Sequence, residues 1–100
     1  MEFTNFALAK SSVTEPTVLG TNFKTDAYYV LSVTYPANTE IYTGALKFDG
    51  ATIIKQLVAM DQKAAGGAYV YIIQPLSNTV TASRYRYNEP VYVSCVCELN

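Results

Sequence analysis

One run of β-branched and aromatic residues constrains the fold of this chain more than any other feature. The nine residues from Ala27 to Tyr35 include three tyrosines, two valines and one threonine, which suit the pleated surface of a sheet. Asp26 precedes the run, and Pro36, which cannot continue a central strand, follows it. We therefore predict a strand at residues 27–35, the strongest strand signal in the first half of the chain.

Further segments on both sides of this run are predicted to be strands. A short turn at residues 36–39 leads into residues 40–48, so the two strands are predicted to form an antiparallel hairpin. Near the N-terminus, Phe3 and Phe6 mark a strand or an ordered arm that precedes a loop. The last third of the chain predicts a three-stranded meander. Its strands are residues 68–74, 79–87 and 91–98.

The segment after Asp49-Gly50 permits two interpretations. Asp-Gly between apolar runs is a strong hairpin signal, which would make residues 51–60 a strand. The apolar positions, however, recur at spacings of three and four, and Gly66-Gly67 is able to end a helix. We therefore predict an amphipathic helix at residues 51–65, with its apolar stripe on the sheet. The apolar positions are Ile53, Ile54, Leu57, Val58, Met60 and Ala64.

Together these elements predict an α+β fold, a mainly antiparallel sheet of about six strands with one amphipathic helix packed on it. The predicted order is one strand, a hairpin, the helix and three further strands. The alternative is an all-β sandwich, which requires a hairpin turn at Asp49-Gly50. The length of 100 residues suits a single domain, 1–100, in which residues 1–25 form the strand or arm and a loop.

The composition predicts a folded chain without catalytic machinery. Half of the residues (50%) are hydrophobic and only 15% are charged, so a core forms and some apolar surface is left for a partner. The chain has no His, which excludes Ser-His-Asp, Cys-His and HExxH chemistry. The Walker and dinucleotide-binding fingerprints are also absent. We predict no catalytic residue, no cofactor and no small-molecule substrate.

The charge and the apolar runs predict a soluble protein. Seven basic and eight acidic residues give a net charge of -1, which disfavours a general binder of polyanions. The N-terminus has neither the basic region nor the long apolar region of a secretory signal. The longest strongly apolar stretch, residues 68–73, is far shorter than the roughly 20 residues of a membrane helix. We expect synthesis in the cytoplasm and no membrane contact.

Two cysteines lie two positions apart near the C-terminus, Cys95 and Cys97. A closed zinc site needs two more nitrogen or sulfur ligands, and the chain has no other Cys and no His, so we predict no metal site within one copy. We expect Val91, Val93 and both cysteines to form one buried face of the last strand. The alternatives are a redox role or a disulfide between chains.

One segment favours nucleic acid, Arg84-Tyr85-Arg86-Tyr87. Guanidinium groups that reach phosphates, beside rings that stack on bases, are typical of single-strand binders. On a strand, Arg84 and Arg86 would share one face, and Tyr85 and Tyr87 the other. A single-stranded nucleic-acid-binding module that uses these four residues is the alternative function.

All nine tyrosines lie in predicted strands. Tyr offers a large contact area at low entropic cost and is enriched at the centres of protein interfaces. Packing across strands within one subunit is its other common role. Together with the two phenylalanines of the N-terminal segment, the predicted contact residues are Phe3, Phe6, Tyr28, Tyr42, Tyr69, Tyr71, Tyr85, Tyr87 and Tyr92.

Low charge, tyrosine-rich strands and terminal strands able to pair with a neighbouring sheet favour a structural subunit. We predict a non-enzymatic protein that forms homo-oligomers or docks on a larger protein assembly. In general texture the chain resembles small virion proteins, such as capsid decoration or coat subunits of bacterial viruses. The resemblance is compositional and assigns a role to no residue.

Overall fold

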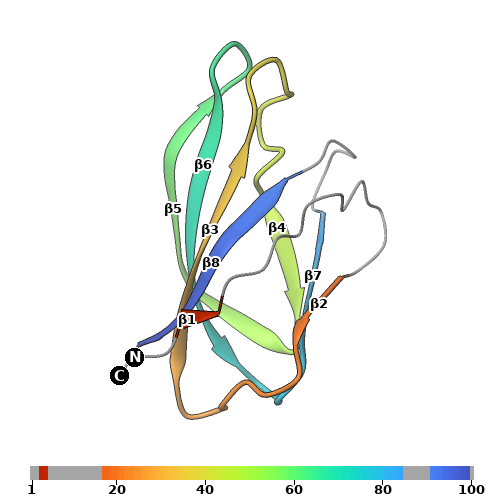
Figure 1. Ribbon diagram of the computed structural model, residues 1–100, viewed down its shortest axis with the longest axis vertical. Coiled ribbons are helices and arrows are strands. Elements are labelled where there is room, and N and C mark those ends of the chain that lie inside the picture. The colour runs from red at the N-terminus through yellow and green to blue at the C-terminus, as the bar shows by residue number, and fades with distance from the viewer. Residues whose placement is uncertain (1–2, 5–16, 85–90, 100) are drawn as a thin grey trace.

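The computed structural model describes residues 3–4, 17–84 and 91–99, which form two antiparallel sheets and no helix (Figure 1). The larger sheet has five strands, in the order β1 (Phe3–Thr4), β8 (Tyr92–Leu99), β3 (Tyr28–Tyr35), β6 (Gly66–Pro75) and β5 (Ala51–Gln62). The smaller sheet has three strands, in the order β2 (Thr17–Gly20), β7 (Val80–Arg84) and β4 (Leu46–Asp49). Within the described ranges, no helix is long and apolar enough to cross a membrane.

A single hydrophobic core lies between the two sheets. Alternate residues of β3 and β6 point inward, because successive side chains of a strand point to opposite faces. The smaller sheet supplies aliphatic side chains from all three of its strands, and β8 and the residue before it supply two valines. The buried hydrophobic residues are Leu19, Tyr29, Leu31, Val33, Tyr35, Leu46, Tyr69, Tyr71, Ile73, Val80, Ala82, Val91 and Val93.

The predicted helix at residues 51–65 is wrong, because β5 occupies most of this segment. The register with β6 shifts between Ile53 and Lys55 and again between Val58 and Met60. Each shift inserts one extra residue and reverses the alternation of faces. The residues that share one face therefore recur at spacings of two and three instead of two alone. This irregular pattern resembles the spacing of an amphipathic helix. The observed fold is the all-β sandwich of the alternative interpretation.

The strand after Gly50 is thus predicted correctly by the alternative, but Gly50 is not a hairpin turn. It joins β4 of the smaller sheet to β5 of the larger sheet, so it is a corner between the two layers. Its φ is 83°, and a side chain there would collide with the carbonyl oxygen of Thr79. Only glycine adopts this conformation without strain.

Two predicted pairings are also wrong, although most of the strands exist. β3 does not form a hairpin with β4, the strand that follows it. β3 pairs with β6 and with β8, whereas β4 lies in the smaller sheet. The last three strands do not form a meander, because β7 belongs to the smaller sheet while β6 and β8 flank β3. Strands that follow one another along the chain often belong to different sheets. The inner faces of the two sheets pack together in one core.

The predicted apolar face of the last strand is confirmed for Val91 and Val93, which are fully buried. The side chains of Cys95 and Cys97 lie outside the described part of the structure. The register between β3 and β8 shifts between Ser32 and Val33. Val93 is opposite Val33, whereas Cys95 is opposite Ser32. The alternation that linked the valines to the cysteines is therefore interrupted by a bulge.

Candidate interaction surface

β5 is one of the two edge strands of the larger sheet (Figure 1). It is exposed along most of its length. β6 bonds to one of its edges, and the other edge faces away from the sheet. Every residue from Thr52 to Met60 is exposed, and Val58 reaches 51%. The large apolar side chains on this strand are Ile53, Ile54, Leu57, Val58 and Met60.

β5 carries apolar side chains on both of its faces. Residues directly opposite each other in an antiparallel ladder share a face. Val58 is opposite the buried Tyr69, so it lies on the inner face of the sheet. Leu57 is opposite the half-buried Val70, so it lies on the outer face. By the same register, Ile53 and Gln56 are inner residues, and Lys55 and Met60 are outer residues.

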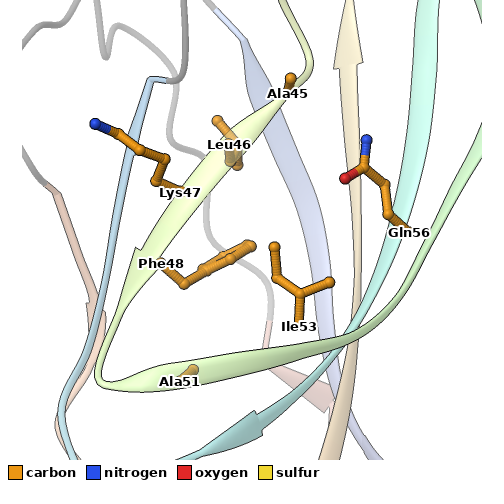
Figure 2. Close-up of a pocket in the computed structure, with 7 residues that line it drawn as sticks. All are labelled: Ala45, Leu46, Lys47, Phe48, Ala51, Ile53 and Gln56. Carbon is orange, nitrogen blue, oxygen red and sulfur yellow. The ribbon is translucent and has the colours of Figure 1, made fainter.

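The inner side of β5 borders an open groove of about 670 Å³ between β5 and β4 (Figure 2). Phe48 and Ile53 approach each other across it, and Lys47 points away at its rim. Phe48 also packs edge-on against the buried Tyr71, with 5.3 Å between ring centroids. The groove is thus the side on which the sandwich opens toward solvent. It is lined by Ala45, Leu46, Lys47, Phe48, Ala51, Ile53 and Gln56.

The outer face of the larger sheet continues the apolar surface of β5. Val70 and Ile72 of β6 and Val30 of β3 are half-buried on this face. Val70 is opposite Leu57, and Ile72 is opposite Lys55. An apolar stripe therefore crosses three adjacent strands and ends at the edge of β5 with which no described strand pairs. Contiguous apolar patches of this kind are uncommon on monomers and typical of interaction sites.

The predicted contact tyrosines divide into exposed and buried groups. Tyr28, Tyr42 and Tyr92 are 43–46% exposed and are available to a partner. Tyr69 and Tyr71 are fully buried in the core of the protomer, so they do not form part of its surface. Tyr69 and Tyr71 share a face with the buried Ile73, which is the inner face of β6.

The other predicted site residues lie mostly outside the described part of the chain. Phe6, Tyr85, Arg86 and Tyr87 fall in ranges for which no structure is described. Phe3 belongs to β1, where its backbone is opposite Cys97 of the same chain. Arg84 ends β7, with its backbone opposite Leu46. The predicted nucleic-acid site, Arg84, Tyr85, Arg86 and Tyr87, therefore stays a prediction, because most of it lies outside the described residues.

A carboxylate at the far end of β5 fixes the neighbouring loop. Asp61 accepts hydrogen bonds from the backbone N–H of Tyr42, at 3.0 Å and 3.2 Å, and from the hydroxyl of Tyr69, at 2.7 Å. Tyr42 has a φ of 67°, a conformation that costs free energy for a residue other than glycine. A salt bridge of 2.9 Å between Lys63 and Glu40 ties the same loop to the hairpin of β5 and β6. These contacts tie the end of β5 to the loop that contains Tyr42.

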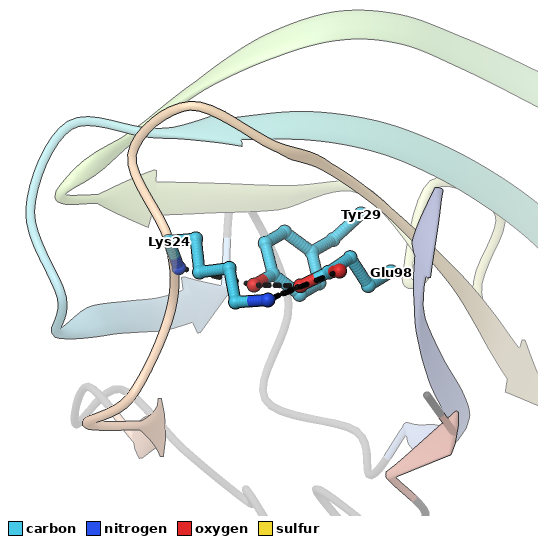
Figure 3. A network of polar contacts seen from close by, with 3 residues as sticks. All are labelled: Lys24, Tyr29 and Glu98. Carbon is cyan, nitrogen blue, oxygen red and sulfur yellow. Dashed lines mark hydrogen bonds and ion pairs between the residues drawn. The ribbon is translucent and has the colours of Figure 1, made fainter. Parts of the chain in front are cut away.

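A second polar network joins the loop before β3 to the last strand (Figure 3). The hydroxyl of Tyr29 donates to Oε1 of Glu98 at 3.0 Å and accepts from the backbone N–H of Lys24 at 3.0 Å. The ammonium of Lys24 lies 3.4 Å from the same carboxylate, which is almost fully buried. Because every member of this network has a partner, the network stabilises the fold of one protomer.

The free energy of unfolding should fall as the pH rises above about 10. Burial and, second, the hydrogen bond to Asp61 raise the pKa of Tyr69 above its ordinary value of 10.0, and burial also raises the pKa of Tyr29. The folded protein therefore holds these two protons more tightly than the unfolded chain does. The resulting stabilisation is complete below the unfolded pKa and is lost as the pH rises through the folded values.

Urea unfolding between about pH 8 and pH 11 measures this dependence. The Tyr69→Phe variant lacks one of the two hydroxyls and should lose less stability over the same range. Equal losses in the variant and the original protein would contradict the assignment to Tyr69.

The apolar edge of β5 was missed at the level of sequence, although a signal for it existed. Among the twelve residues of the strand only Lys55 and Asp61 are charged, so the segment lacks the polar face that a surface helix would present to water.

No group of three or more potential metal ligands occurs within residues 3–4, 17–84 and 91–99. No protein-family model, curated protein or solved structure matches this chain.

Proposed function

We propose that this chain is a non-enzymatic structural subunit that self-assembles by pairing β5 with β5 of a second copy. The observation that carries the proposal is one twelve-residue outermost strand with apolar side chains on both faces. A row of unpaired backbone groups on such an edge is a template for a further strand. Pairing would continue the sheet of one copy into the sheet of the other.

The middle of the strand has few of the features that prevent such pairing. Edge strands of monomers commonly carry Pro or inward-pointing charges. β5 contains no Pro, and its inner residues Ile53, Gln56 and Val58 carry no charge. Asp61, near the end of the strand, is the one inner charge, and it accepts hydrogen bonds from Tyr42 and Tyr69. Lys55, Asp61 and the two bulges are the protective features of the strand, but between the bulges residues 55–58 run in regular register.

Three properties favour a second copy as the partner. An antiparallel ladder forms about one hydrogen bond per paired residue, so two copies of β5 would make on the order of ten, which is typical of a stable interface. A pair related by a twofold axis is also closed, so no further copies are needed to satisfy either edge. The net charge of -1 creates little repulsion between copies.

A capsid, coat or decoration subunit of a virion is one kind of protein that works in this way, and it stays a prediction of the sequence. The exposed Tyr28 and Tyr92 lie on the outer face of the larger sheet, where a joined sheet would present them to further partners. A larger assembly would use this face in addition to the β5 edge.

A matched pair of Leu→Lys substitutions tests the proposal. Leu57→Lys places a charge on the β5 edge and should convert the oligomer into a monomer at micromolar concentration. Leu76→Lys makes the same change at an exposed turn and should leave the mass unchanged. Sedimentation equilibrium measures the mass, and circular dichroism should show that both variants keep the β-sheet spectrum of the original protein. A monomeric original protein, or equal masses for the two variants, would contradict the proposal.

A further inference from the structure

We infer that the two copies of β5 pair antiparallel with Leu57 on the twofold axis. The inference rests on the proposed self-assembly and adds to it the register of the interface. It is carried by the length of β5, by the faces on which its residues lie and by the position of its one outer charge, Lys55.

The geometry of a joined sheet restricts the axis to a few positions. A twofold axis perpendicular to the sheet keeps the outer residues of both copies on the same face of the joined sheet. Residues opposite each other must share a face, so the axis passes through one residue position, and that residue is opposite its own copy. The strand spans residues 51–62, so an axis at Gln56 or at Leu57 gives the greatest overlap. An axis at Leu57 places residue 52 of one copy opposite residue 62 of the other.

The charge of Lys55 separates these two registers. With the axis at Gln56, the two copies of Lys55 would lie two positions apart on the outer face, about 7 Å along the strands. With the axis at Leu57 they would lie four positions apart, about 13 Å, which exceeds the roughly 10 Å screening length at 0.1 M salt. Asp61 does not offset this charge, because it accepts hydrogen bonds from Tyr42 and Tyr69 and lies on the inner face.

The same register fits the side chains on both faces. On the outer face, Leu57 would meet its own copy beside Val70, which joins the two apolar stripes. On the inner face, Val58 of the second copy would be opposite Gln56, a residue that lines the groove between β4 and β5. Each copy would then place an apolar side chain at the open side of its partner's core.

Disulfide trapping tests the register directly. In a background with Cys95→Ser and Cys97→Ser, Leu57→Cys should give a covalent dimer on oxidation, because directly opposite Cα atoms lie about 4.5–5.5 Å apart. Gln56→Cys should give none, because its two copies would be displaced by two positions, beyond the reach of a disulfide. Trapping at Gln56 instead of Leu57 would overturn the register and leave self-assembly standing.

A charge variant provides a second test that needs no change to the cysteines. Leu57→Glu should weaken the dimer at least tenfold, since like charges would face each other on the axis. An equal mixture of Leu57→Glu and Leu57→Lys should restore it. With the axis at Gln56, Leu57→Glu would instead be opposite Lys55 and strengthen the dimer, which would overturn the register. A monomeric original protein in sedimentation equilibrium would overturn both the register and the proposed function.

Discussion

Replacing Tyr71 with alanine should cost about 3–5 kcal/mol of the free energy of unfolding. The side chain is fully buried at the centre of β6, and its ring stacks on Tyr69 and contacts Phe48 edge-on. Its hydroxyl accepts from the backbone N–H of Leu46 at 2.9 Å and donates to the carbonyl oxygen of Gly44 at 3.1 Å. Tyr71 thus anchors the start of β4 to the larger sheet. A loss of this size is a large share of the 5–15 kcal/mol that stabilises a typical domain.

Urea unfolding of two further variants separates the parts of this effect. Tyr71→Phe keeps the ring and leaves two buried backbone groups without a partner, so it should cost about 1–3 kcal/mol. Tyr28→Ala removes an exposed ring from β3 and should stay within about 0.5 kcal/mol of the original protein. If Tyr71→Ala unfolds at the same urea concentration as Tyr28→Ala, then Tyr71 does not hold the two sheets together.

The strands with a regular period of two could be predicted from the sequence, because alternation and composition agree in them. In β3, the inward residues Tyr29, Leu31, Val33 and Tyr35 alternate without interruption, and the predicted range differs from the observed one by a single residue. β6 follows the same pattern with Tyr69, Tyr71 and Ile73. Their pairing was not predictable in the same way, since local pattern does not say which strand lies beside which.

The pattern of β5 misled the prediction for two physical reasons. Its bulges at Ile54 and Ala59 break the period of two. Its apolar residues also face solvent on both sides, whereas a pattern-based reading assumes that an apolar stripe is buried. The sequence pattern of the candidate interaction surface therefore predicts a core-facing helix. The position of β5 at the edge of the sheet corrects this prediction.

The tyrosines show a similar limit. Composition identifies Tyr as a residue of interfaces and of sheet cores alike. Tyr28 and Tyr29 are neighbours in the chain, yet one is exposed and the other is buried and bonded to Glu98. The smaller sheet packs on one face of the larger sheet, and this position alone determines which of the two tyrosines is buried.

Gly67→Ala should cost about 1–3 kcal/mol or more, because it overfills a site that is already occupied by a ring. Gly67 is opposite Tyr35 in the ladder, and a Cβ atom at this position would overlap the ring of Tyr35. Tyr35 is buried, and within the described ranges its hydroxyl has no hydrogen-bond partner, so the ring is held by packing alone. Tyr on a neighbouring strand commonly covers a glycine in this way. The methyl group would force the ring out of the core.

A double-mutant cycle with Tyr35→Ala distinguishes this clash from a general intolerance of the strand. Once the ring has been removed, Gly67→Ala should cost less than it does in the original protein, so the two changes together should destabilise the fold by less than the sum of the single changes. Urea unfolding of the four proteins gives the coupling. Additive costs would mean that the sensitivity of Gly67 comes from its backbone and not from Tyr35.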